Sequence, residues 1–268
     1  MYRTNSLPMQ FLFVAIAVLA SVALIVPSLA QAGAILFEDD FRGGKVDGSG
    51  KWHTALGKWA IQGGTLIKQG ADLGLILVTD DHWDDAWNDY WFYSTITLTG
   101  GQELGVFWRF FTKGQQGGAF SNPGNLPKRL QGNESRHVVY WALNREGKFS
   151  IVQRDVKTVS QPFAKTETKT KLKSGQEYWV KVENHPKGYR LFLTDNGGQA
   201  KSGNYGEPVV DVKDINIQGR GRIGFGSTDS RFKVDDVYVV EPDTNPFSVE
   251  AHGKLATTWG MLKSRQTR

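Results

Sequence analysis

The densest mixture of carboxylates and aromatic side chains in this chain lies in one stretch, Asp80 to Trp91, which reads DDHWDDAWNDYW. Proteins bind sugars with aromatic rings that lie against the C–H faces of the sugar and with a few oriented polar groups that bind its hydroxyls. We therefore predict a carbohydrate subsite formed by Trp83, Trp87, Asp84 and Asp85. The alternative is a solvated loop whose tryptophans fold back on the rim of the domain.

Signatures of catalysis are missing from the sequence. A retaining glycosidase of the laminarinase type needs a Glu-x-Asp-x-x-Glu strand whose carboxylates lie about 5–5.5 Å apart, and no such spacing occurs. There is also no Gly-x-Ser-x-Gly nucleophile elbow, and the five histidines show no spacing typical of zinc ligands. Asp84, Asp85 and Glu103 are available carboxylates, but each has a simpler explanation as a loop or strand-end residue. We assign no catalytic residue.

The glycines from Gly219 to Gly224 fit the dinucleotide fingerprint G-x-G-x-x-G. That motif works only between a strand and a helix whose N-terminus receives the pyrophosphate. Here Phe-Gly-Ser and a further strand pattern follow, so we expect a turn and close packing between strands. No nucleotide cofactor is expected.

The elements that must position these side chains are strands. Gly-Gly, Asn-Gly and proline breaks separate the extended runs, and no helical period is convincing after residue 32. The fold class is therefore all-β. Runs with apolar alternation or high aromatic and β-branched content lie at 58–68, 73–79, 89–98, 103–111, 137–144, 148–157, 177–184, 188–194, 208–212, 221–227 and 231–240.

Alternation also assigns side chains to faces. Tyr178, Val180 and Val182 share one face, which we expect to seal the core, whereas Trp179, Lys181 and Glu183 share the other. In the last strand the apolar parity changes between Val234 and Val237, so an extra residue must be absorbed at Asp235-Asp236 by a β-bulge.

The two ends of the domain look like strand partners: FEDDF (37–41) with Trp52, Trp59 and Gly63-Gly64 near the start, and GRIGFGS with FKVDDVYVVEP near the end. Together with DYWFYSTITL and GVFWRF in the middle, these segments resemble concanavalin A-like jelly rolls. They are most similar to the laminin-G-like and 3-keto-disaccharide hydrolase (family-16-like) domains of secreted bacterial proteins. The resemblance covers Ile35 to Pro242 and implies a sandwich of two antiparallel sheets.

The resemblance implies a binding role for one arginine. The strand Gly105-Val106-Phe107-Trp108-Arg109 matches a landmark that places its arginine on the concave sheet, where ligands lie in those domains. Alternation would put Phe107 and Phe111 beside Arg109, and a guanidinium among aromatic faces suits polyol or carboxylate oxygens. Tyr140 and Arg154 would complete this second constellation. The alternative is a structural cation–π arginine.

Calcium is the ion that the resemblance implies. Jelly rolls of this kind often carry a structural Ca²⁺ between the N-terminal segment and the last strand, held by carboxylate and carbonyl oxygens, its preferred ligands. The matching positions are Glu38, the Gly64 carbonyl and Asp236. The alternative is that Asp235 and Asp236 cap the bulge.

Residues 1–32 have a cationic start, an apolar run from Phe11 to Val26 and the small-residue pattern Ala30-Gln31-Ala32, which indicate a secretory signal peptide. We expect no membrane span after its cleavage. With no cysteine, stability must come from the core. The net charge of +5 is spread along the chain without a recognition motif, so nucleic acid is not an expected partner. The alternating Lys165–Lys173 run predicts a solvated strand edge.

We therefore expect a signal peptide (1–32), one β-sandwich domain (33–242) and a C-terminal extension (243–268), with a long loop at 112–136. The leading hypothesis is a secreted bacterial lectin-like protein, extracellular or periplasmic, whose partner is a polysaccharide or glycan. A glycoside hydrolase of the 3-keto-disaccharide type and a surface adhesion or architectural module are the alternatives. The sequence identifies neither the sugar nor the oligomeric state.

Overall fold

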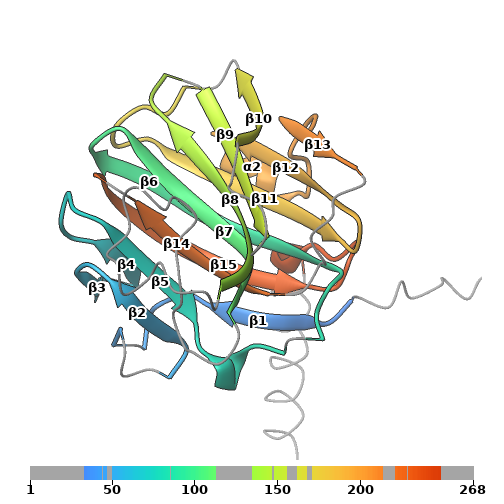
Figure 1. Ribbon diagram of the computed structural model, residues 1–268, viewed down its shortest axis with the longest axis horizontal. Coiled ribbons are helices and arrows are strands. Elements are labelled where there is room, and N and C mark those ends of the chain that lie inside the picture. Colours follow the sequence, from blue (N-terminus) through green and yellow to red (C-terminus); the bar gives the residue numbers. More distant parts are fainter. Residues whose placement is uncertain are drawn as a thin grey trace, which may run out of the picture. The chain divides into compact units, whose positions relative to one another are not determined.

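The computed structural model describes residues 33–43, 45–46, 50–84, 86–112, 135–146, 148–155, 162–167, 171–213, 221–227 and 229–248 (Figure 1). The expected signal peptide, Asp85, residues 113–134 of the long loop and residues 249–268 of the extension lie outside these ranges. No helix within the described ranges is long and apolar enough to cross a membrane.

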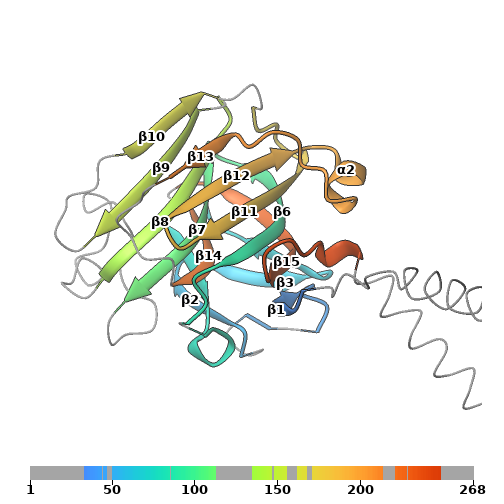
Figure 2. The same ribbon diagram turned by 90° about the vertical axis from the view of Figure 1, so that its right-hand side faces the viewer.

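Two antiparallel sheets form the domain, as the sequence predicted (Figures 1 and 2). The eight-stranded sheet has the order β13 (Val210–Val212), β12 (Gly188–Thr194), β11 (Glu177–His185), β6 (Tyr90–Gly100), β15 (Arg231–Val240), β4 (Thr65–Lys68) and β3 (Trp59–Gln62), with β1 (Ile35–Asp39) also paired to β15. The seven-stranded sheet has the order β10 (Pro162–Glu167), β9 (Lys148–Asp155), β8 (Ser135–Asn144), β7 (Glu103–Thr112), β14 (Arg222–Ser227), β5 (Gly74–Val78) and β2 (Trp52–Leu56). The short helices are η1 (Asp80–His82) and α2 (Gly197–Lys201).

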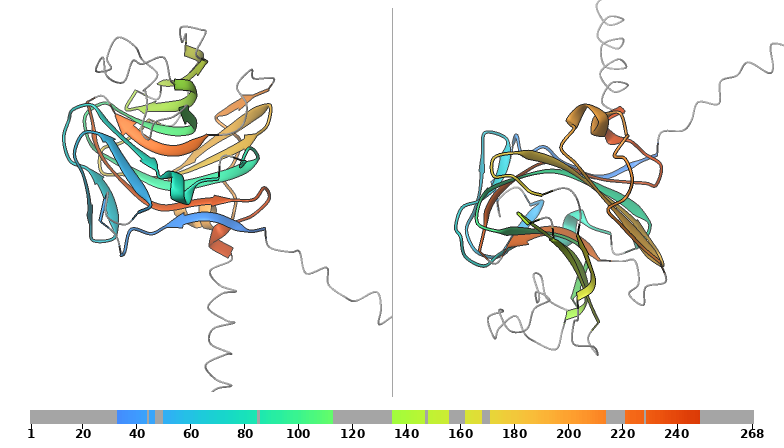
Figure 3. Two further views of the ribbon diagram at one scale, coloured as in Figure 1. Left: turned by 60° about the horizontal axis from the view of Figure 1, so that its bottom comes forward. Right: turned by 90° about the horizontal axis from the view of Figure 1, so that it is seen from above.

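The main core lies between the two sheets, which form the two layers seen from above in Figure 3. Alternation along β11 works as predicted, because Tyr178, Val180 and Val182 all belong to this core. Burial of such side chains stabilises the fold by about 25 cal/mol for each Å² of apolar surface removed from water. The chain thus achieves a packed interior without any disulfide.

The other face of β11 is also covered. Trp179 packs there with Phe192, Tyr205 and Tyr238 in a second cluster, against which Phe247 also packs. Figure 2 shows α2 and the segment 243–248 on this outer side of the eight-stranded sheet. The packed domain therefore continues past Pro242, the boundary expected from the sequence, to at least Phe247.

A buried ion pair lies within this outer cluster. The Lys181 ammonium is 3.5 Å from the ring centroid of Trp91 and 2.6 Å from Glu183 Oε1. Glu183 also pairs with the half-exposed Arg190. Burial lowers the pKa of Lys181, and its hydrogen bond to Glu183 opposes that shift. Lys181 and Glu183 therefore lie on the same face of β11, as alternation predicted, but this face is buried.

The N-terminal and C-terminal strands are paired, as predicted. Ile35 lies opposite Val240 and Asp39 opposite Val237, while β4 pairs with the earlier part of β15. The register of β15 against β6 shifts between Asp235 and Tyr238, and Asp236 has a positive φ of 49°. The β-bulge predicted from the parity change is therefore confirmed.

Two of the three glycines that fit the dinucleotide fingerprint serve sheet packing, and the third, Gly219, lies outside the described residues. Gly221 has a φ of 120°, and a Cβ at this position would collide with the backbone of Arg109. At Gly224 a Cβ would collide with the carbonyl oxygen of Ile76 on the neighbouring strand. The residues that follow form strand β14, as expected from their pattern.

Candidate functional site

Three of the residues predicted to bind carbohydrate, Trp83, Asp84 and Trp87, line a surface hollow of about 430 Å³. The walls come from β1, from Lys51 just before β2, and from the loop that carries the chain from β5 to β6. The hollow thus lies where the chain crosses between the two sheets. Its lining comprises Leu36, Phe37, Glu38, Lys51, Asp81, His82, Trp83, Asp84 and Trp87.

Hydrogen bonds hold the loop against the segment before β2. Pairing of Trp52 with Val78 places Lys51 beside Thr79, whose N–H donates to the Lys51 carbonyl at 3.0 Å. The Thr79 hydroxyl lies 3.1 Å from His82 Nδ1. The first turn of the loop is therefore anchored, which pre-organises the lining of the hollow.

The two tryptophans occupy different environments. Trp83 is 7% exposed and belongs to the core, where it packs edge-on against Tyr90 with a ring-centroid distance of 5.5 Å. Trp87 is half-buried and packs edge-on against Trp83 at 5.0 Å. Trp83 thus folds back on the rim, as the alternative interpretation required, whereas part of Trp87 remains open to solvent. The indole N–H of Trp83 has no acceptor within the described residues.

Asp84 shapes the loop as well as lining the hollow. Its Oδ1 accepts a hydrogen bond from the Ala86 N–H at 2.8 Å, and its carbonyl accepts one from the Trp87 N–H at 3.0 Å. The second oxygen of this exposed carboxylate is left for other partners. Asp85, the fourth predicted residue, lies outside the described ranges.

A second hollow of about 280 Å³ adjoins the first and shares Glu38 and Lys51 with it. The Lys51 ammonium, at their junction, donates to the Glu38 carbonyl at 2.8 Å and lies 3.9 Å from Asp39 Oδ1. Sequence reasoning did not identify Lys51, because its place in the site depends on the pairing of β2 with β5. The lining of the second hollow is Glu38, Asp39, Asp40, Lys51 and Tyr238.

The expectation that Arg109 contacts a ligand on the concave sheet is corrected by the structure. Arg109 is fully buried between the sheets, where it donates to Asn184 Oδ1 and to the carbonyls of His185 and Gly188, the last at 2.8 Å. Its guanidinium lies 5.9 Å from the ring centroid of Tyr189. Burial lowers its pKa to about 10, so it remains charged at neutral pH.

A β-bulge at Arg109 explains this placement. The register of β7 against β8 shifts between Trp108 and Phe111, and Arg109 has a positive φ of 56°. The bulge breaks the alternation that put Arg109 beside Phe107, and the side chain turns inward. Of the other two residues in that constellation, Tyr140 pairs with Phe107 and Arg154 with Val138. Their side chains lie outside the described part of the structure.

The predicted calcium residues are only partly brought together. Gly64 has a φ of 77° in the turn between β3 and β4, and a Cβ there would lie 3.8 Å from the Asp40 carbonyl oxygen. Asp235 accepts a hydrogen bond from the Thr65 hydroxyl at 3.4 Å. Burial is the main cause that raises the pKa of Asp235, and the charges of Asp236 and Asp40 add to it.

The N-terminal carboxylate near Gly64 and Asp235 is therefore Asp40, whereas Glu38 lines the two hollows. No group of three side chains able to ligate a metal occurs within the described ranges. A hard cation would instead have to use two carboxylates with carbonyl oxygens, a donor set that suits Ca²⁺. We refer to Asp40, Gly64, Asp235 and Asp236 as the acidic corner.

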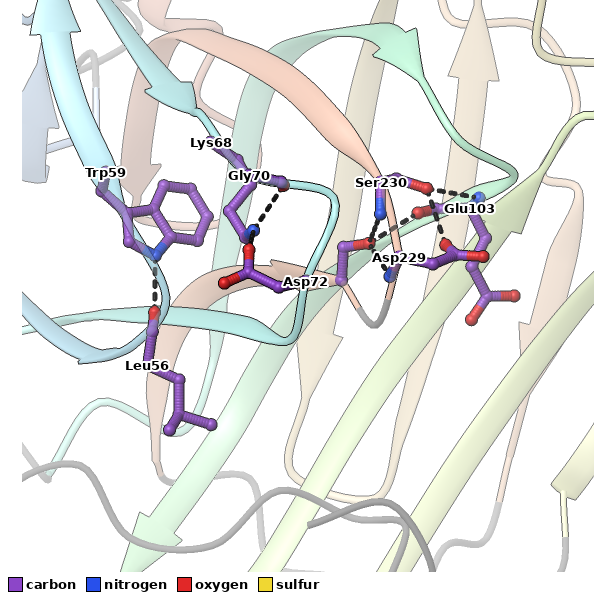
Figure 4. Close-up of polar contacts among 9 residues, drawn as sticks. Leu56, Trp59, Lys68, Gly70, Asp72, Glu103, Asp229 and Ser230 are labelled. Carbon is purple, nitrogen blue, oxygen red and sulfur yellow. Dashed lines mark hydrogen bonds and ion pairs between the residues drawn. The ribbon is translucent and has the colours of Figure 1, made fainter. Parts of the chain in front are cut away.

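Glu103, the remaining available carboxylate, has a strand-end role (Figure 4). Its N–H donates to Ser230 Oγ at 2.9 Å, and its carbonyl accepts from Ser227 Oγ at 3.0 Å. Burial raises the pKa of its carboxyl, and the charge of Asp229 adds to the shift. Figure 4 also shows the fully buried Lys68, whose ammonium donates to the Gly70 carbonyl at 2.6 Å and to Asp72 at 2.8 Å.

Comparison with known proteins identifies the fold. No family model matches the sequence, and no curated protein sequence is found to be related. The domain is similar to the carbohydrate binding module CBM66 from Bacillus subtilis (TM-score 0.50, 13% identity, 71% of this chain and 96% of that one). It is also similar to a B. subtilis protein of unknown function with a galectin-like fold (0.52, 13%, 79% and 97%).

A third similar structure is the exoplasmic/lumenal domain of VIP36 in its Ca²⁺/Man2-bound form (TM-score 0.51, 8% identity, 77% of this chain and 87% of that one). Identities this low establish the fold and nothing finer. The laminin-G-like and 3-keto-disaccharide hydrolase resemblance stays a prediction. The chain has a concanavalin A-like jelly-roll fold.

Proposed function

We propose that this protein is a secreted bacterial carbohydrate-binding protein and that the hollow beside Trp87 holds its glycan. The observation that carries the proposal is the partly exposed Trp87 ring in a hollow that also presents Asp81, Asp84 and Glu38. An apolar face beside a few polar groups is the combination that binds a sugar. The fold shared with a carbohydrate binding module and with a mannose-bound lumenal domain supports the proposal.

Replacing Trp87 with alanine is expected to weaken glycan binding at least about tenfold, or about 1.4 kcal/mol, because the sugar loses its aromatic platform. The binding partner is first identified by screening residues 33–268 on a glycan array, and its affinity is then measured by calorimetry. Trp59→Ala is the matched control, since Trp59 is also partly buried but lies on β3 outside the hollow. Both variants are measured at a temperature at which circular dichroism shows them folded.

Four outcomes test the proposal against the other candidate functions. Binding without release of reducing sugar supports the proposal, whereas release would favour the hydrolase. Equal losses of affinity in Trp87→Ala and Trp59→Ala would show that the hollow is not the site. No binding to any glycan would contradict the proposal and favour an adhesion or architectural protein.

We also propose that the acidic corner holds a structural Ca²⁺. The residues fit the ion because Asp40, Asp235 and Asp236 bring negative charge together near the Gly64 turn, where burial and like charges raise the pKa of Asp235. A bound cation would offset that repulsion and tie the N-terminal segment to β15. Asp40, Asp235 and the Gly64 carbonyl are the ligands we propose.

Calcium at one hundred times its Kd is then expected to stabilise the domain by about 2.7 kcal/mol. Thermal unfolding of residues 33–268 in CaCl2 and in EGTA checks this expectation. Asp235→Asn should abolish the calcium-dependent shift in Tm, while the exposed Asp195→Asn keeps it. An identical Tm with and without calcium would show that the corner binds no structural calcium.

A further inference from the structure

The two hollows adjoin each other, because Glu38 and Lys51 line both of them. Trp87 belongs to the lining of the first hollow and Tyr238 to the lining of the second. We call their union the β1 groove, because β1 runs along it. Two adjoining hollows suit a linear chain of several sugar units better than a single sugar.

Charge in the β1 groove is opposite to that of the whole chain. The formal net charge of the protein is +5, yet the groove is lined by five carboxylates and one ammonium group. The ammonium, Lys51, is already engaged by the Glu38 carbonyl and Asp39. The groove is therefore a local acidic feature that the overall composition does not explain.

Two of the carboxylates have no partner of their own within the described residues. Glu38 and Asp81 are exposed, and neither carboxylate takes part in a hydrogen bond or ion pair there. Asp39, by contrast, accepts from the Phe41 N–H and from Trp52 Nε1. Glu38 lies at the junction of the hollows, so its carboxylate can reach a ligand that enters either of them.

This arrangement favours a cationic sugar over an anionic one. A protonated amine gains a charge-assisted hydrogen bond from a carboxylate and a cation–π contact from an exposed tryptophan face. A uronate or sulfate group would face like charges, which disfavour binding. The buried indole N–H of Trp83, which lacks an acceptor, belongs to the same lining.

We propose that the β1 groove binds a linear oligosaccharide with free amino groups, such as a deacetylated hexosamine chain. This inference rests on the proposed function. The ring of Trp87 holds one sugar unit, Glu38 takes the ammonium of a unit at the junction, and further units extend toward Tyr238.

Chitosan oligosaccharides of two to six units test the proposal against chitin oligosaccharides of the same lengths and against oligouronates. Calorimetry is done with residues 33–268 at a pH below the pKa of the sugar amine, so that the amine is protonated. We expect the deacetylated tetramer to bind at least tenfold more tightly than the acetylated tetramer. It should also bind at least tenfold more tightly than the deacetylated dimer. Added salt should reduce the preference for the amine.

Glu38→Gln is expected to weaken binding of the deacetylated chain much more than binding of the acetylated chain, and so to remove most of the preference for free amino groups. Asp195→Asn, which removes an exposed carboxylate outside the groove, should leave the preference intact. A glycan that depends on Trp87 but binds equally well without free amines, or more tightly as a uronate, would overturn this inference while the proposed function stands. Failure of every glycan to bind would overturn both.

Discussion

Replacing Arg109 with methionine should lower the free energy of unfolding by about 3–5 kcal/mol, because each buried acceptor left without a donor costs about 1–3 kcal/mol. The guanidinium joins β7 of one sheet to β11 and β12 of the other through Asn184 and the carbonyls of His185 and Gly188. Methionine fills similar space but leaves these buried acceptors without their donor. Denaturant unfolding followed by fluorescence measures the loss.

The appropriate control is Arg145→Met, because Arg145 is exposed in the turn after β8. That change should alter stability by no more than about 0.5 kcal/mol. Arg109→Lys should fall between the two, since lysine keeps the charge but not the planar fork. Arg109→Met molecules that remain folded should bind glycan normally. If they lost binding while their stability stayed at the wild-type value, Arg109 would be a ligand contact after all.

Much of this fold could be predicted because strand patterns are repeated and local. Alternation placed Tyr178 and Lys181 on opposite faces of one strand, and the parity change at Asp235-Asp236 predicted the bulge. Both signals lie within a few consecutive residues. The pairing of β1 with β15 was predicted from the similar patterns of two segments at the ends of the domain.

Arg109 shows where such reasoning fails. The residues around it, Val106 to Phe111, are bulky on both faces of the strand, so no change of parity in the sequence marks the bulge or the positive φ. The backbone needs room for this conformation, which Gly221, the residue just before β14, provides because a side chain there would collide with Arg109. That relation is visible only once β7 and β14 are paired.

The candidate site was predicted only in part, because some of its residues come together only through strand pairing. Trp83, Trp87 and Asp84 are close in sequence, and their composition indicated a sugar-binding site. Lys51 and Glu38 join them through the pairing of β2 with β5 and through the position of β1. Short elements such as β2 and α2, each of five residues, were missed because they are too short to show a period.

The second large effect is expected at Lys181. Lys181→Met should cost about 3 kcal/mol, because it leaves the Glu183 carboxylate, 3% exposed, with the half-exposed Arg190 as its remaining cation. Glu183→Leu should also be costly, since the ammonium would then stay among aromatic rings without a carboxylate. The double variant should cost less than the sum of the two single changes, by at least about 1 kcal/mol. Urea unfolding of the wild type, the two single variants and the double variant measures these free energies in a double-mutant cycle.

The pH dependence gives an independent check on the same pair. Burial lowers the pKa of Lys181 in the folded state, so the unfolded chain binds more protons between that value and about 10.4. Stability contributed by this group therefore rises with pH across that interval. In Glu183→Leu the hydrogen bond that opposes the shift is gone, the pKa falls further, and stability should rise more steeply with pH than in the wild type. If the losses of stability in the two single variants were additive, and stability rose no more steeply with pH in Glu183→Leu than in the wild type, Lys181 and Glu183 would not be energetically coupled.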